Sequence, residues 1–144
     1  MYLSLLEVEN FRVFGSGDKA ISVCFQSGLN ALIVENDSGK TAIIDAIRHC
    51  LGTTSNDFVF LAEEDFHISQ GSRASEIRIS CKFEGLSELV ASRLVEWLSV
   101  ENDAPVLYVT LIAKRNEDTK IKRRKISYTV KTNFRWERTL CSIE

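Results

Sequence analysis

The amino-acid sequence predicts an α/β fold, and three observations support that prediction. A short apolar run at residues 31–34 is followed by a polar loop at 35–39, and a helical pattern begins at Lys40-Thr41. Segments that alternate apolar and polar residues with a period of two, as strands do, lie before and after this unit. A length of 144 residues with 44% hydrophobic content corresponds to at most one globular domain.

Two strands are expected before the polar loop. Residues 2–14 place Leu3, Leu5 and Val8 in a strand-like alternation with a turn near Asn10, and residues 15–18 have the composition of a turn. Residues 21–25 form a second short strand in this interpretation, and Gly28 turns the chain back. A hairpin therefore precedes the strand at 31–34. Simple P-loop kinases and GTPases usually place the phosphate loop directly after their first strand, so this order argues against them.

Residues 34–41 have the pattern of a phosphate-binding loop. Strand, loop, Gly39-Lys40-Thr41 and helix place successive backbone N–H groups and a helix N-terminus around an anion. Lys40 would reach the outer phosphates, and the Thr41 hydroxyl would ligate Mg²⁺. The consensus G-x-x-x-x-G-K-[ST] has glycine where this chain has Val34, so we expect weaker binding. The alternative is a chance Gly-Lys-Thr with merely solvated or capping side chains.

The elements after the loop follow from periodicity and turn signals. The helix from Lys40 is expected to bury Ile43, Ile44, Ile47, Cys50 and Leu51 on one side. Residues 58–67 carry the acidic triplet Glu63-Glu64-Asp65, and residues 71–75 form a polar loop. Strands are expected at 76–83, 106–113 and 125–131, turns at 102–105 and 116–120, and a helix at 86–99. Its apolar face comprises Leu86, Leu89, Val90, Leu94, Trp97 and Leu98.

Composition and charge limit the function classes. The net charge is −2, yet residues 114–138 contain ten Lys or Arg and three Asp or Glu, which gives +7 for that segment. Such a basic segment is typical of a nucleic-acid surface or, more often, of a solvated strand edge. Four separated cysteines (Cys24, Cys50, Cys81, Cys141) lack metal-ligand spacing and indicate free thiols. Without a secretory signal or a long apolar run, we expect a cytoplasmic protein with no membrane partner.

Two motifs together resemble a known group of ATPases. The opening L-x-x-V-x-N-F-R-x-F (residues 5–14) and the later G-L-N-x-L-I-V-E-N-D-S-G-K-T-x-x-x-D-A-I resemble the amino terminus of ABC-type ATPase heads of the SMC/RecF/OLD group. Within the group the loop looks most like that of OLD-family ATP-dependent endonucleases, which commonly reads G-E-N-N-S-G-K-T. The resemblance implies a mixed sheet with an antiparallel β-subdomain beside a P-loop core. Residues 1–144 would be a single incomplete head domain with its loop at 34–41.

The resemblance also implies cofactors, site residues and partners. ATP and Mg²⁺ would be bound, ATPase heads would pair in a homodimer or oligomer, and DNA would be a partner of the longer protein. Arg12, which matches the N-F-R arginine, would lie near the nucleotide, or would be a surface arginine that closes the hairpin. Asp65 or Gln70 would lie near the γ-phosphate and Mg²⁺, whereas the acidic triplet otherwise reads as a solvated turn end. The phosphates would be held by Asn36, Asp37, Ser38, Gly39, Lys40, Thr41 and Ala42.

Several parts that ABC-type hydrolysis needs are missing from this sequence. No apolar strand ends in Asp-Glu, since residues 106–113 run into Lys114-Arg115, and no signature motif or TOPRIM-like acidic set follows. The chain therefore resembles the N-terminal part of a head and is expected to bind ATP without turnover. The leading hypothesis is the ATP-binding segment of an OLD-like DNA endonuclease, a family often found in phage defence. The alternative is a degenerate head that acts as a non-catalytic oligomerising or partner-binding module.

Overall fold

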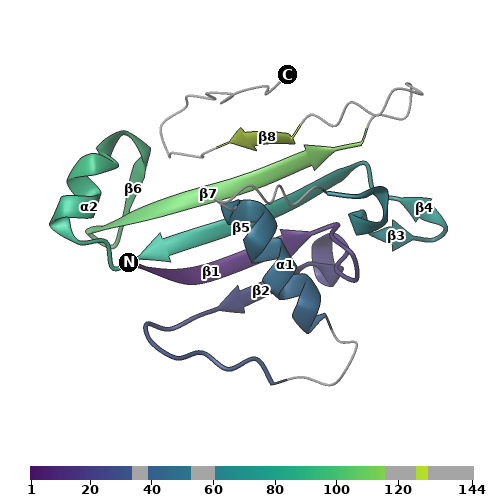
Figure 1. Ribbon diagram of the computed structural model, residues 1–144, viewed down its shortest axis with the longest axis horizontal. Helices are drawn as coiled ribbons and strands as arrows, with labels where there is room; N and C mark the ends of the chain where they lie inside the picture. The colour runs from purple at the N-terminus through teal and green to yellow at the C-terminus, as the bar shows by residue number, and fades with distance from the viewer. Residues whose placement is uncertain (34–38, 53–60, 116–125, 130–144) are drawn as a thin grey trace.

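The computed structural model places one helix across an antiparallel sheet (Figure 1). It describes residues 1–33, 39–52, 61–115 and 126–129. The sheet order is β2-β1-β5-β7-β6. β6 and β8 pair with the same edge of β7, β6 with residues 104–107 and β8 with residues 110–113. β3 and β4 form a separate pair. The elements are β1 (Tyr2–Glu9), η1 (Gly17–Lys19), β2 (Ile21–Cys24), α1 (Lys40–Leu51), η2 (Glu63–Asp65), β3 (Ile68–Ser69), β4 (Ser72–Arg73), β5 (Glu76–Glu84), α2 (Glu88–Arg93), η3 (Val95–Trp97), β6 (Leu98–Glu101), β7 (Ala104–Lys114) and β8 (Ile126–Thr129).

The hairpin expected before the phosphate loop is confirmed. β1 pairs antiparallel with β2, and its other edge pairs with β5, so the N-terminal strand lies inside the sheet. β1 ends at Glu9, and the turn expected near Asn10 follows it, since Asn10 has φ 58°. The strands expected at 76–83, 106–113 and 125–131 correspond to β5, β7 and β8. The turn expected at 116–120 lies outside the described residues.

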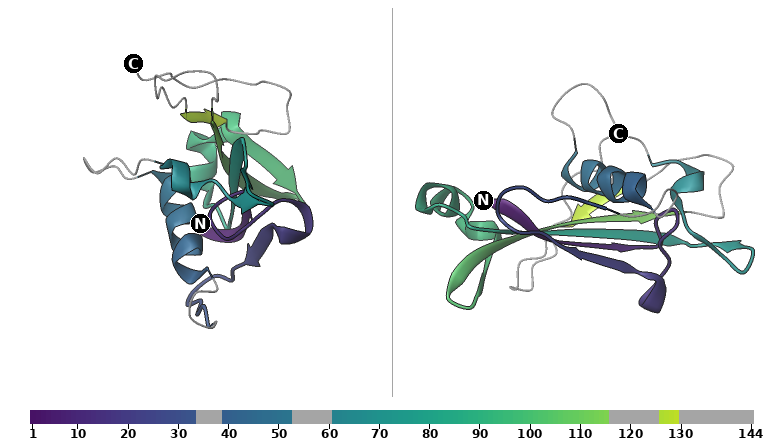
Figure 2. Two further views of the ribbon diagram at one scale, coloured as in Figure 1. Left: turned by 90° about the vertical axis from the view of Figure 1, so that its right-hand side faces the viewer. Right: turned by 90° about the horizontal axis from the view of Figure 1, so that it is seen from below.

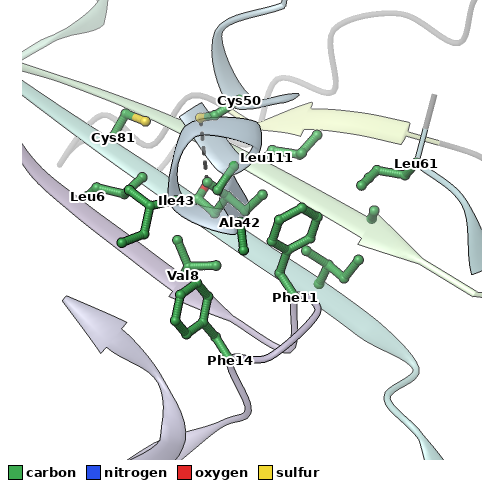
Figure 3. Close-up of a cluster of buried hydrophobic side chains, with 14 of the residues drawn as sticks. Leu6, Val8, Phe11, Phe14, Ala42, Ile43, Cys50, Leu61, Cys81 and Leu111 are labelled. Carbon is green, nitrogen blue, oxygen red and sulfur yellow. Dashed lines mark hydrogen bonds between the residues drawn. The ribbon is translucent and has the colours of Figure 1, made fainter. Parts of the chain in front are cut away.

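The hydrophobic core lies between the sheet and α1, which crosses one face of it (Figure 2). Alternate residues of the inner strands β1, β5 and β7 point toward the helix, as the period of two predicts. Figure 3 shows several of these side chains gathered under α1. The fully buried strand residues of this face are Leu6 and Val8 of β1, Ile77, Ile79 and Cys81 of β5, and Leu111 of β7.

The buried face of α1 differs from the expected one. Ile44 is 53% exposed and Leu51 is 48% exposed, so their predicted burial is wrong. Each residue turns the helix by about 100°, which places these two side chains far from the contact stripe. The stripe instead includes two alanines, which let the helix backbone approach the sheet closely. Its buried members are Ala42, Ile43, Ala46, His49 and Cys50.

The predicted buried strand at 31–34 is wrong for its described residues, 31–33. These residues form no strand; Ile33 is 90% exposed, and the preceding Leu29 is 99% exposed. A strand needs a neighbour for its backbone hydrogen bonds, and no strand in the described ranges pairs with this segment. Only Leu32 packs against the core in part. Val34 lies outside the described residues.

The predicted helix at 86–99 is confirmed only in part, by α2 and the short η3 that follows it. α2 covers only Glu88–Arg93 and has no buried residue, and Leu98–Glu101 enters the sheet as β6. Asn102 and Asp103 have φ 48° and 61°, which makes a tight two-residue turn that folds β6 onto β7. This turn prevails over the helical periodicity of the apolar residues. None of the helices in the described ranges is long and apolar enough to cross a membrane.

Candidate functional site

The N-terminus of α1 is the centre of the candidate site. Gly39 is the N-cap residue, with left-handed φ 97° and ψ 11°, and its carbonyl accepts the first helical hydrogen bond from Ile43 N at 2.9 Å. The first turn carries no acidic side chain; Lys40 is half-buried and Thr41 is exposed. This end of the helix therefore offers backbone donors, a partial positive charge and a lysine to an anion.

Gly39 is required by packing as well as by its backbone conformation. A Cβ atom at this position would lie 2.7 Å from Phe14 Cζ and 3.0 Å from Val13 Cγ2. Residues with a Cβ also disfavour the left-handed region. The loop between β1 and β2 thus packs directly on the start of α1, and only glycine fits beneath it.

Backbone hydrogen bonds hold that loop in place. Arg12 N donates to Asp65 O at 2.7 Å, and His67 N donates to Asn10 O at 2.9 Å, so bonds on both sides of Phe11 tie the loop to residues 65–67. The His67 ring Nδ1 also lies 2.7 Å from Arg12 O. Phe11 is fully buried between these bonds. The loop is therefore a fixed part of the fold, with Arg12 held at φ 50°.

Two carboxylates from separate segments bind the Arg12 guanidinium. Its Nε donates to Asp65 Oδ1 at 2.8 Å, and its Nη1 donates to Asp45 Oδ2 of α1 at 2.5 Å. The other oxygen of Asp65 accepts a bond from Ala62 N at 2.7 Å, and Arg48 Nη1 lies 3.4 Å from Asp45 Oδ1. Burial acts to lower the pKa of Arg12, but its bonds to the two carboxylates outweigh this and raise that pKa.

Sequence reasoning singled out Arg12 and Asp65 separately but missed that Arg12 binds Asp65 directly and also binds Asp45, so that the three form one ion-pair network. A single acid inside the otherwise apolar stretch Ile43–Ile47 is the sequence signal for it. Whether Arg12 lies beside a nucleotide stays a prediction. Its side chain is 33% exposed, so it is not a freely solvated surface arginine.

The members of the acidic triplet have different environments. Glu63 and Glu64 are exposed, as expected for a turn end, whereas Asp65 is 5% exposed and accepts the bonds described above. Gln70 is exposed in the two-residue turn that joins β3 to β4, with φ 50°. The described ranges contain no group of three or more His, Cys, Asp or Glu residues placed to hold a metal ion. The Mg²⁺ roles of Thr41 and of Asp65 or Gln70 stay predictions.

Other predicted residues lie outside the described ranges. These are Asn36, Asp37 and Ser38 of the phosphate loop, Cys141, and most of the basic segment 114–138. At the start of that segment, Lys114 Nζ and Arg115 Nη1 each lie 3.4 Å from a glutamate, Glu76 and Glu63 respectively. Cys24, Cys50 and Cys81 are free thiols, as the cysteine spacing predicts.

The fold and this site define the N-terminal part of an ABC-type ATPase head of the SMC/RecF type. The family model described as AAA ATPase domain matches residues 1–141, so the chain belongs to that family. Over 75 residues the chain is 35% identical to the chromosome partition protein Smc of Halothermothrix orenii. That match covers 46% of this chain and 6% of Smc, so the chain spans only a small fraction of that relative's length.

A solved structure supports the same fold. It comes from work on the ATP-driven dimerization and DNA-stimulated activation of SMC ATPases, and it matches with a TM-score of 0.59 at 19% sequence identity. The match covers 89% of this chain and 68% of that one. The predicted fold class, the N-terminal part of an ABC-type ATPase head with an antiparallel β-subdomain, is confirmed.

Proposed function

We propose that this chain binds Mg-ATP through residues 36–42 at the N-terminus of α1, as the N-terminal segment of an ATPase head. The observation that supports it best is the geometry at Gly39. A left-handed glycine starts the helix, Lys40 and Thr41 follow in the first turn, and a fixed loop packs on the glycine from one side. Phosphate loops combine these features because they bring backbone amides and a lysine to one anion.

The residues present fit a nucleotide–magnesium complex. The helix N-terminus and Lys40 would stabilise the negative charge of the outer phosphates, and the Thr41 hydroxyl would supply an oxygen ligand of the kind that Mg²⁺ prefers. Bound Mg²⁺ would neutralise part of the phosphate charge. Because the sequence contains no Asp-Glu strand to polarise water, we expect this chain alone to bind ATP without steady hydrolysis.

Calorimetry with Mg-ATP tests the proposal. The wild-type chain should bind, and Lys40→Ala should lose at least tenfold in affinity because it removes a charged phosphate contact, worth more than about 1.4 kcal/mol. Lys19→Ala is the matched control, since Lys19 is an exposed lysine in η1. Equal affinity of the wild type and Lys40→Ala would refute the proposal.

The finer assignment is an OLD-like ATP-dependent DNA endonuclease that acts in phage defence in the cytoplasm. Its support is the loop sequence E-N-D-S-G-K-T, which looks most like OLD-family loops, together with the N-F-R opening. We further propose that ATP drives two heads into a dimer, as described for the similar SMC ATPase. Sedimentation with and without Mg-ATP tests this point: the dimer should form only with nucleotide, and Lys40→Ala should remain monomeric.

A second candidate function is a non-catalytic module that binds a partner or another copy. Its support is the apolar surface that the described residues leave exposed. Leu29 and Ile33 precede the phosphate loop, and Leu89, Val95 and Val100 lie on α2, η3 and β6, all more than 60% exposed. This candidate predicts an oligomer in the absence of nucleotide. A monomer that binds Mg-ATP tightly would count against it.

A further inference from the structure

One guanidinium joins three segments at the side of the phosphate-loop helix. Arg12 belongs to the loop between β1 and β2, Asp45 to α1, and Asp65 to η2. We propose that Arg12 is a positioning residue: by holding Asp45 it fixes the first turns of α1, and so sets the affinity for the nucleotide without touching a phosphate. This inference rests on the proposed function, because the quantity that it controls is Mg-ATP affinity.

The position of Asp45 along the helix supports an indirect role. Asp45 follows Lys40 by five residues, which is about 7.5 Å along the helix axis at 1.5 Å per residue. Arg12 is held beside the helix, because its Nε is bonded to Asp65 and its Nη1 to Asp45. Its bonds therefore act on where the helix sits rather than on the anion at its end.

The anchor on the far side of Arg12 is rigid. Asp65 is 5% exposed and bonds both the Arg12 side chain and Ala62 N, while its carbonyl accepts Arg12 N. A planar guanidinium with several donors in a fixed fork is suited to bridging two carboxylates in one geometry. Asp45 is thus tied to a buried carboxylate that cannot move independently of the fold.

The same loop touches α1 at a second point. Phe14 packs on Gly39 at the N-cap, and Arg12 binds Asp45 about one and a half turns further along. Two contacts at different heights fix both the rotation of the helix and its position along its axis. Phosphate binding depends on both, since the amides of the first turn must converge on one anion and misplacement by about 1 Å costs much of the interaction.

A double-mutant cycle on Mg-ATP affinity tests the inference, with Arg12→Gln, Asp45→Asn and the double variant. If Arg12 acts through Asp45, each single variant should bind Mg-ATP about tenfold more weakly than the wild type. The double variant should also bind about tenfold more weakly, rather than a hundredfold, because the two substitutions remove the same interaction. Additive losses near a hundredfold would overturn it, since Arg12 would then act independently of Asp45. Tighter binding by Asp45→Asn would also overturn it, because Asp45 would then merely repel phosphate.

The Mg-ATP affinity of each variant is measured well below its thermal unfolding midpoint, where the chain is folded. A loss of stability alone then leaves the dissociation constant unchanged. A purely structural role would lower the midpoint without changing that constant, and this result would overturn the inference. Should Arg12→Gln fail to fold, Asp45→Asn keeps the test, because its weaker binding is required in either case. Lys82→Ala, which breaks ion pairs remote from α1, is the control and should retain wild-type affinity.

Failure of the inference can be told apart from failure of the proposed function. If the wild type binds Mg-ATP and Lys40→Ala does not, while the Arg12 and Asp45 variants bind like the wild type, only the inference falls. If the wild type does not bind Mg-ATP at all, the proposed function falls and takes the inference with it.

Discussion

Replacing Gly39 with alanine tests how closely the loop between β1 and β2 packs on the start of α1. The new Cβ atom would lie 2.7 Å from Phe14 Cζ, closer than real Cβ contacts allow, and 3.0 Å from Val13 Cγ2, which is tighter than most real contacts. Over-packing in a well-packed region costs about 1–3 kcal/mol, and the left-handed backbone at φ 97° adds about 1–2 kcal/mol. We expect Gly39→Ala to lower the free energy of unfolding by about 2–5 kcal/mol.

Gly28→Ala separates the two contributions. Gly28 has a similar φ of 102°, but a Cβ atom there would meet no other atom within 4 Å. It should therefore lose only the backbone part, about 1–2 kcal/mol. Urea unfolding followed by circular dichroism measures both variants. Equal losses at Gly39 and Gly28 would refute the packing argument, as would an undiminished loss from Gly39→Ala in a Phe14→Leu background, where Cζ is absent.

Further predictions concern the ion pairs. Arg12→Ala should lower the free energy of unfolding by about 1–3 kcal/mol, because it removes the charged partner of the nearly buried Asp65 carboxylate. Arg48→Ala removes an exposed ion pair and should change the free energy of unfolding by at most about 1 kcal/mol in the same urea assay. Hydrogen bonds from Lys82 lower the pKa of Glu84 and Glu101 below their ordinary 4.5, so this stabilisation is present above pH 4.5 and is lost as the pH falls through the lowered values. Lys82→Met should therefore show a smaller loss of stability between pH 6 and pH 3 than the wild type; an identical pH profile would contradict this.

Local patterns predicted the parts of this fold that local physics controls. Along β5, buried residues alternate with partly buried ones as its sequence predicts, and α1 starts at the Gly39-Lys40 boundary that the motif predicts. Both follow from short-range periodicity and helix-start chemistry. The antiparallel hairpin before the loop likewise follows from two short alternating runs separated by turn residues.

Long-range contacts account for the errors. The apolar run at 31–33 has strand composition but lies next to no paired strand, and periodicity carries no information about the neighbour. The helix expected at 86–99 lost its last two residues, Leu98 and Ser99, to β6, because the Asn102-Asp103 turn pairs that segment with β7. In the site, the bond between Arg12 and Asp45 joins residues 33 positions apart, which no motif spacing reveals.

The most direct test of the proposed nucleotide site is a titration of the chain with Mg-ATP followed by amide NMR. The account predicts that the N–H resonances of Gly39, Lys40, Thr41 and Ala42 shift together along one binding curve, while those of β6, at the opposite end of the sheet (Figure 1), stay in place. Unmoved resonances at residues 39–42, with shifts elsewhere or none, would contradict it.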